Sequence, residues 1–138
     1  LEQSSKVQAA CPWYPPTDTS KFQYQEAEQC AASPESLLLG FNVMKNPEKG
    51  YENSPVSKVT KEAPPFLIIH GTNDRTVPFS QSESLYESLE KNGCDVTFLA
   101  LEGADHADLQ FFQDEVWERM IAFFKEKLTR ICEENIKS

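Results

Sequence analysis

Two segments in the second half of the chain place a titratable side chain just after an apolar run. Phe66 to Ile69 precedes a turn that carries Asp74, and Leu99 to Leu101 precedes a turn that carries His106. A carboxylate beside an imidazole fixes the tautomer of the ring and stabilises its protonated form. These residue types therefore predict an acid–histidine relay, with Asp74 as the acid and His106 as the base that activates a hydroxyl nucleophile.

Other titratable groups near these turns have weaker claims to chemistry. His70 ends an apolar run beside Gly71, so we expect a structural role for it. Asp105, His106 and Asp108 offer one imidazole and two carboxylates, which is a thin ligand set for a metal ion. We therefore predict no metal and no cofactor.

Two roles are possible for each of three further side chains. Arg75 either pairs with a carboxylate and orients the Asp74 turn or is an ordinary surface residue, and the surface interpretation is favoured. Trp13 and Tyr14 either line a pocket or pack in the core, and the sequence does not choose between these.

The elements that hold the two turns follow from the apolar pattern. Phe66 to Ile69 shows no alternation, which is typical of a strand buried on both faces, and Val96 to Leu101 is a second β-rich run. Ser80-x-x-Glu83 is a capping-box pattern that predicts a helix start, and Gly93 stands where that helix would end. From Leu109 to Ile131, apolar residues recur at helical spacing and predict one long amphipathic helix.

The first half of the chain is less regular. Val7 to Cys11 is a short apolar run that ends at Pro12, and it predicts a strand. Ser33-Pro34 followed by Gly40 predicts a short helix, and one further helical turn is expected near Pro47. The remaining residues between 19 and 64 predict an irregular excursion.

The order of these elements predicts the fold class. Apolar strands that alternate with helices form a parallel sheet covered on both faces. We therefore expect an α/β fold in one unit, residues 1–138, with about three parallel strands. In it, an irregular excursion occupies residues 19–64, and a strand-helix-strand-helix order occupies 65–134. Loops at the carboxyl ends of parallel strands meet at one edge, which would bring Asp74 and His106 together.

Composition argues against several classes of function. The net charge of -9 disfavours nucleic acid or an anionic membrane as partner, since both need a basic face. No stretch approaches the roughly 20 apolar residues of a membrane span. The chain starts without Met and without a charged-then-apolar leader, which is expected of an excised or processed piece.

The cysteines bear on the cellular compartment. None lies in a C-x-x-C pattern or near histidine at ligand spacing; they are Cys11, Cys30, Cys94 and Cys132. We expect mostly buried thiols in a reducing compartment, with a disulfide pair as the alternative. The expected location is cytoplasmic, and secretion stays open.

The motifs in the second half resemble the carboxyl-terminal half of an α/β-hydrolase. His70-Gly71-x-x-Asp74-x-x-Val77-Pro78 and the turn from Gly103 to His106 are similar to the esterase/lipase branch that includes feruloyl-esterase-like enzymes. The prolyl oligopeptidase family lies nearby. The stretch from Tyr14 to Asp18 resembles the end of the strand after the nucleophile region. The resemblance implies that Asp74 is the triad acid and His106 the triad base.

The chain departs from the family pattern in two ways. The nucleophile elbow G-x-S-x-G is absent, because no two of the five glycines are four residues apart, and no His-Gly-Gly stretch supplies an oxyanion hole. The histidine turn of the family has glycine on both sides of the histidine, where this chain has Asp105 and Ala107. We therefore expect a fragment of a serine-type ester hydrolase that is inactive alone.

Alternatives to this function remain open. They are a fragment of a prolyl-oligopeptidase-like serine peptidase, a split enzyme whose other half supplies the serine, and a non-catalytic α/β binding module. The complete enzyme would act on an ester of a small acid, with a carbohydrate ester as one candidate. Since the strand at Val7 to Cys11 would lack its neighbour, we expect a homo-oligomer through this edge or association with the missing amino-terminal half.

Overall fold

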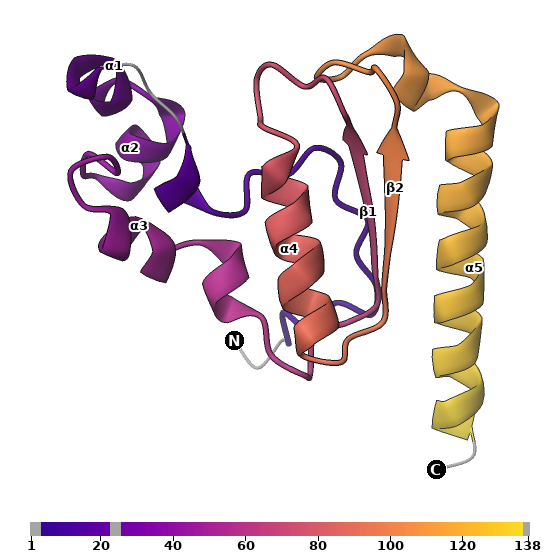
Figure 1. Cartoon of the computed structure of the whole chain (residues 1–138). Helices are drawn as coiled ribbons and strands as arrows, with labels where there is room; N and C mark the ends of the chain where they lie inside the picture. The colour runs from indigo at the N-terminus through magenta and orange to yellow at the C-terminus, as the bar shows by residue number, and fades with distance from the viewer. Residues whose placement is uncertain (1–3, 23–25, 137–138) are drawn as a thin grey trace.

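The computed structural model describes residues 4–22 and 26–136, with side chains up to residue 129. Strands β1 (Phe66–Gly71) and β2 (Val96–Leu101) pair in parallel. Helix α4 (Ser80–Lys91) connects them on one face of the sheet, and helix α5 (Asp114–Ile136) follows β2 on the other face (Figure 1). The predicted α/β fold, a partial α/β-hydrolase sheet with helices on both faces, is confirmed.

The third predicted strand, Val7 to Cys11, is wrong as a continuous element. Residues 10–13 run parallel to β1 but meet it only at isolated bridges formed by Ala10 and Trp13. Pro12 lies between the two bridges and has no N–H group, so the ladder loses one hydrogen bond at that point. The described part of the chain therefore has a two-stranded sheet with an extended segment along the other side of β1.

Residues 19–64, predicted as an irregular excursion, contain several short helices to one side of the sheet (Figure 1). The predicted helix after Ser33 is confirmed: the Ser33 side chain caps it by accepting from Ser36 N–H, and Gly40 ends it with φ of 74°. The helix α1 (Ala27–Ala31) has no capping side chain, which explains why the sequence pattern did not predict it. The five elements are η1 (Thr19–Lys21), α1 (Ala27–Ala31), α2 (Pro34–Leu39), α3 (Pro47–Glu52) and η2 (Pro55–Lys58).

The predicted cap of α4 is wrong, although its end at Gly93 is confirmed by a φ of 72°. Ser80 does not cap the helix, because Phe79 before it already has helical backbone angles. The first turn closes instead when Gln81 N–H donates to the Pro78 carbonyl at 2.9 Å.

The long helix predicted from Leu109 is divided in two. A 3-10 turn, η3 (Leu109–Phe112), precedes α5, because Asp108 caps η3 and Gln113 then adopts extended backbone. The Leu109 side chain is 81% exposed, so it does not belong to the apolar stripe of α5.

The core forms on both faces of the sheet. Neighbouring residues of β1 point to opposite faces, so Ile68 and Ile69 join different clusters. The cluster on the α5 side contains Leu67, Ile69, Ala104, Phe111, Val116 and Phe123. The cluster on the α4 side contains Val56, Ile68, Leu85 and Leu89. Because β1 is packed from both sides, the turn that follows it starts from a fixed point.

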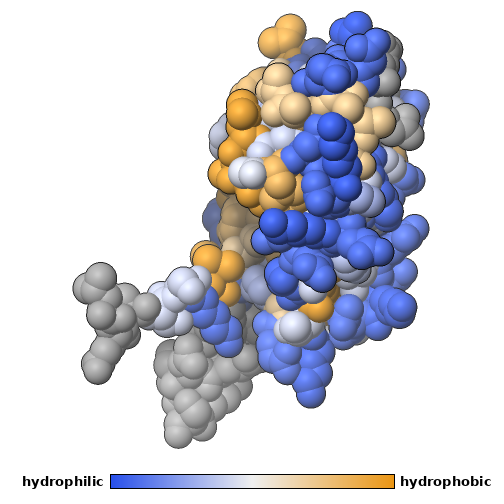
Figure 2. Space-filling view, turned by 90° about the vertical axis from the view of Figure 1, so that its left-hand side faces the viewer, coloured by the Kyte–Doolittle hydropathy of each residue, from blue (hydrophilic) through white to orange (hydrophobic). Residues whose placement is uncertain are grey.

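The outer surface is mainly polar on the side of the short helices. Figure 2 shows hydrophilic residues over most of this face, with apolar residues gathered toward one margin. In the described ranges, no helix combines the length and the apolar character that crossing a bilayer requires.

Candidate active site

Asp74 lies in the tight turn that follows β1. Its Oδ1 atom accepts hydrogen bonds from the N–H groups of Thr76 and Val77, both at 2.8 Å, so the carboxylate caps its own turn. The Asp74 side chain has no exposed surface. The carboxylate is therefore fixed in direction, and its Oδ2 atom is available to other partners.

His106 lies in the turn that follows β2. Gly103 enters this turn with φ of 72°, and Ala107, directly after the histidine, has φ of 54°. Both values fall in the left-handed region that favours glycine, so Ala107 keeps the turn at a cost in backbone strain. The Asp108 carboxylate accepts from Asp105 N–H at 3.3 Å and ties the end of the turn to its start.

The two turns bring Asp74 and His106 together. His106 Nδ1 lies 2.8 Å from Asp74 Oδ2, so the prediction that the side chains lie within hydrogen-bond reach is confirmed. A carboxylate only accepts, so Nδ1 carries the proton, and Nε2 of the neutral ring keeps its lone pair. The His106 side chain is 28% exposed while that of Asp74 is buried. The base is therefore accessible, and the acid lies behind it.

Close backbone approach holds the two turns in register. Asn73 N–H donates to the Ala104 carbonyl at 3.0 Å, and Gly103 N–H donates to Thr72 Oγ1 at 2.8 Å. A Cβ atom at Gly71 would lie 2.8 Å from the carbonyl carbon of Ala104 and 3.0 Å from its Cβ. Only glycine fits at position 71 without moving the turn that carries His106.

A second pair bridges the turns at the surface. Arg75 donates to Asp105 from its main-chain N–H at 3.0 Å and from Nε at 2.6 Å, and its terminal nitrogen also pairs with Asp105. The main-chain hydrogen bond from Arg75 has the largest effect, and together with the side-chain bonds it lowers the pKa of Asp105 to about 2. The favoured surface interpretation of Arg75 is wrong, because this residue pairs with the carboxylate beside His106. Its side chain is nevertheless 81% exposed.

His70 is buried, as expected of a structural residue, but it also contacts Asp74. Its Nε2 atom lies 3.1 Å from Asp74 Oδ2 and 2.9 Å from the Val77 carbonyl, and its Nδ1 atom lies 2.6 Å from Ser82 Oγ. Sequence reasoning missed this contact. The signal was the four-residue spacing between His70 and Asp74 across a glycine turn.

Trp13 and Tyr14 have different surroundings. The Trp13 ring packs on Phe111 at 5.6 Å between ring centroids, beside the α5-side core. The Tyr14 ring lies 4.2 Å from that of His106, and its φ of 38° is left-handed. Both rings therefore pack against the α5-side core, and Tyr14 in addition borders the candidate site.

The described side chains add little else to the site. Within residues 4–22 and 26–129, no group of three or more His, Cys, Asp or Glu side chains could hold a metal ion, and His106 Nε2 has no hydrogen-bond partner. Cys11, Cys30 and Cys94 are free thiols, but only Cys30 is buried as expected, because Cys11 and Cys94 are half-buried. The Cys132 side chain lies outside the described ones.

Several known proteins that are similar to this chain are named as esterases. The profile of the BD-FAE family matches residues 1–89, a span that includes Asp74. The chain is 37% identical over 73 residues to Esterase LipC of Mycobacterium tuberculosis, covering 52% of this chain and 18% of LipC. It is 33% identical over 102 residues to Esterase LipQ of the same organism, covering 73% of this chain and 24% of LipQ.

A solved structure extends the similarity through the histidine turn. A truncated form of carbohydrate esterase from gut microbiota has a TM-score of 0.79 at 30% identity, covering 91% of this chain and 44% of that chain. This chain thus spans less than a quarter of the curated relatives named above and less than half of that structure. Since the family profile covers more than half of its residues, this chain belongs to the BD-FAE family, with the fold of the carboxyl-terminal part of an esterase-like α/β-hydrolase.

Proposed function

We propose that this chain supplies the acid, Asp74, and the base, His106, of a serine-type carboxylic ester hydrolase. The observation that carries this proposal is the 2.8 Å hydrogen bond from a partly exposed imidazole to a buried carboxylate. That is the arrangement in which one ring nitrogen is held and the other is free to move protons. The esterase names of the relatives support the same chemistry.

The chemistry of this pair is proton transfer at His106 Nε2. As a serine hydroxyl attacks the ester carbonyl, Nε2 takes its proton, and Asp74 stabilises the imidazolium that forms. Nε2 then returns the proton to the departing alkoxide, which leaves an acyl-serine. A water molecule repeats the cycle, giving its proton to Nε2 and releasing the acid and the free serine.

The serine and the oxyanion donors are proposed to come from outside these 138 residues. The sequence has no G-x-S-x-G elbow and no His-Gly-Gly stretch. Without a serine at Nε2, the pair has no covalent route. The chain by itself is therefore proposed to be inactive.

We propose that the missing part joins along the extended segment beside β1. Ala10 N–H donates to the Pro65 carbonyl at 2.9 Å, and Tyr14 N–H donates to the Ile69 carbonyl at 2.8 Å. Backbone groups of alternate residues face opposite sides of a strand, so those of the intervening Cys11 face away from β1. Within the described residues, the Cys11 N–H has no partner, and such an edge accepts a further strand.

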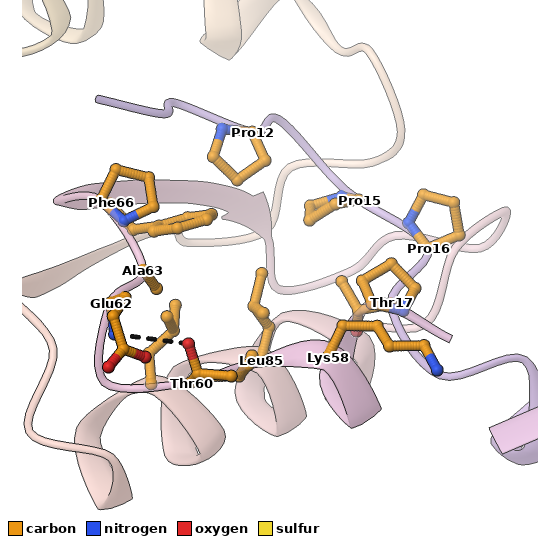
Figure 3. A pocket seen from close by; sticks show the side chains of 14 residues that line it. Pro12, Pro15, Pro16, Thr17, Lys58, Thr60, Glu62, Ala63, Phe66 and Leu85 are labelled. Carbon is orange, nitrogen blue, oxygen red and sulfur yellow. Dashed lines mark hydrogen bonds between the residues drawn. The ribbon is translucent and has the colours of Figure 1, made fainter. Parts of the chain in front are cut away.

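An apolar pocket lies beside this edge on the α4 face (Figure 3). Its volume is about 470 Å³, and Pro12, Pro15, Phe66 and Leu85 are among the side chains that line it. An unpaired edge next to an apolar hollow suits a strand and an accompanying helix, since both faces of a parallel sheet are normally covered. The proposed occupant is the part of the enzyme that carries the nucleophile; a second copy of this chain, giving a homo-oligomer, is the alternative.

Light scattering at micromolar concentration tests the edge. We expect a mass above that of one chain, and expect Val7→Lys to reduce it, because a charge blunts an exposed edge. Leu38→Lys on α2 is the matched control, since Leu38 is 86% exposed and Val7 is 53% exposed. A folded monomer that also fails to bind the nucleophile-carrying part would refute the proposal.

The proposed substrate is an ester of a small acid on a carbohydrate. The supporting observation is the similarity to the gut carbohydrate esterase over 91% of this chain. In the complete protein, acetylated or feruloylated oligosaccharides should be cleaved faster than proline-containing peptide amides. The reverse preference would favour the peptidase alternative.

A chimera tests the catalytic roles. This chain replaces the matched part of the gut carbohydrate esterase, and hydrolysis of a short-chain nitrophenyl ester is measured. His106→Ala should lower kcat by about 10³-fold or more, since removing the base disables the serine. Asp95→Asn, which alters an exposed carboxylate just before β2, at the end of the strand away from His106, is the control. Equal activity of the folded His106→Ala chimera would overturn the assignment.

A further inference from the structure

The ring of His70 sits between three polar groups behind the candidate pair. It has no exposed surface, and Ser82 is likewise fully buried. His70 Nε2 lies 2.9 Å from the Val77 carbonyl and 3.1 Å from Asp74 Oδ2, and Nδ1 lies 2.6 Å from Ser82 Oγ. Both ring nitrogens are thus engaged by groups from the Asp74 turn and from α4.

These contacts determine the tautomer of His70. A carbonyl and a carboxylate only accept, so the Nε2 atom that faces them carries the proton. Burial lowers the pKa of His70, against the opposing effects of Val77 and Asp74, which favours the neutral ring. Nδ1 then has a lone pair, and the Ser82 hydroxyl donates to it. His70 and His106 therefore carry their protons on opposite nitrogens.

The Asp74 carboxylate is fully occupied as a result. Oδ1 accepts from the Thr76 and Val77 N–H groups. Oδ2 accepts from His106 Nδ1 and also from His70 Nε2–H, which it shares with the nearer Val77 carbonyl. A carboxylate has about four acceptor positions, so every one is used. The two histidines donate to the same oxygen, at 3.1 Å from His70 and 2.8 Å from His106, which restrains Oδ2 from turning away from His106.

The position of Ser82 on α4 is fixed through its neighbour Gln81, which makes buried hydrogen bonds to the first segment of the chain. Its neighbour Gln81 accepts at Oε1 from Thr17 N–H at 2.9 Å and Asp18 N–H at 2.7 Å, and donates from Nε2 to the Asp18 carbonyl at 3.0 Å. Phe79 packs edge-on against the His70 ring at 5.6 Å between centroids. The start of α4 is therefore anchored, and with it the hydroxyl that satisfies His70.

We infer that His70 is a positioning residue for the Asp74–His106 pair, and that Ser82 supports it. His70 donates from Nε2 to Oδ2, holds the carboxylate toward His106, and so keeps the proton of His106 on Nδ1. This inference rests on the proposed function, since positioning matters only if Nε2 of His106 acts as the base.

Long-range ¹H–¹⁵N spectra of the imidazole rings test this directly in the 138-residue chain. The wild type should show His106 protonated on Nδ1 and His70 protonated on Nε2. In His70→Met, which removes the donor but keeps an apolar side chain of similar size, neutral His106 should change from nearly pure Nδ1–H to a mixture of tautomers. His70→Gln keeps an N–H donor and should restore most of the Nδ1–H form.

Stability controls separate positioning from packing. Leu89→Val removes a methylene group from the α4-side core and should lower the unfolding midpoint while the His106 tautomer stays unchanged. Ser82→Ala should also shift the His106 ring signals, whereas Ser80→Ala, an exposed serine two residues earlier on α4, should not. If His70→Met does not fold, the comparison of the Ser82→Ala and Ser80→Ala spectra tests the positioning role in its place.

The outcomes separate the two claims. A wild-type His106 that is not protonated on Nδ1 would remove the proposed acid–base pair itself. If His106 stays protonated on Nδ1 in folded His70→Met as it is in the wild type, the positioning role is overturned while the acid–base pair stands. If His70→Met does not fold, the same result in Ser82→Ala overturns the positioning role. A loss of the Nδ1–H form in His70→Met and its return in His70→Gln would support the inference.

Discussion

Gly71 is the position at which a single added methyl group should disturb both the fold and the candidate site. In Gly71→Ala the new Cβ would lie 2.8 Å from the Ala104 carbonyl carbon, and closer still to its oxygen. Ordinary contact begins near 3.4 Å, so the carbonyl carbon must move by at least about 0.6 Å, which is 3.4 minus 2.8. That movement strains the Asn73 N–H bond to this carbonyl and shifts the turn that carries His106.

The energetic terms give the expected size of the effect. Overpacking costs about 1–3 kcal/mol, and a weakened buried hydrogen bond adds about 1 kcal/mol. The smaller conformational freedom of the unfolded alanine chain offsets about 0.4–1 kcal/mol. Urea unfolding should therefore show a loss of about 1–3 kcal/mol, and the His106 Nδ1–H form should diminish.

A matched control adds the same methyl group elsewhere. In Gly50→Ala on α3, the nearest atom to the new Cβ is Thr19 Oγ1 at 3.2 Å, which is the tip of a side chain. This variant should stay within about 1 kcal/mol of the wild type, because alanine also favours the helix. If Gly71→Ala unfolds at the same urea concentration as the wild type, the close approach does not hold the turn as described.

Three further predictions concern titration and activity. Burial lowers the pKa of His70, so the unfolded chain binds a proton on this ring at a higher pH than the folded chain does. The free energy of unfolding should therefore reach its plateau above pH 6.5 and fall as the pH drops below that value. Urea unfolding at a series of pH values measures this, and a rise in stability on acidification would contradict it. Arg75→Ala removes the side-chain hydrogen bonds to Asp105 but keeps the main-chain one, so the pKa of Asp105 should rise from about 2 only part of the way to 3.8. Carboxyl NMR titration measures this pKa, and an unchanged value would refute the prediction. Free energy of unfolding should change little in that variant, since the Arg75 side chain is exposed. The isolated chain and its His106→Ala variant should hydrolyse a nitrophenyl ester equally slowly, and a clear loss in the variant would reveal an activated serine among these residues.

The parts of the fold that sequence could predict depend on local patterns. The unbroken apolar run of β1 and the turns after β1 and β2 place Asp74 and His106 at one sheet edge, because parallel strands end together. Gly40 and Gly93 mark helix ends through their left-handed backbone, which few other residues adopt.

The parts that sequence missed depend on contacts between distant segments or on single backbone groups. The Arg75–Asp105 pair joins two turns 30 residues apart, and nothing local indicates it. The expected strand at Val7 to Cys11 is replaced by a segment that meets β1 only from Ala10 onward, and this segment is divided into two bridges because Pro12 lacks an N–H. His70 reaches Asp74 only because the turn folds back on the strand that precedes it.

The central claim, that Asp74 and His106 act as acid and base, is tested most directly by Asp74→Asn in the chimera with the gut carbohydrate esterase. Asparagine has nearly the same shape, so the turn should persist, but its amide would favour the wrong tautomer of His106. We predict that kcat for a short-chain nitrophenyl ester falls by about 10⁴-fold with little change in KM. A folded Asp74→Asn chimera that keeps its kcat within about tenfold of the parent chimera would contradict the account.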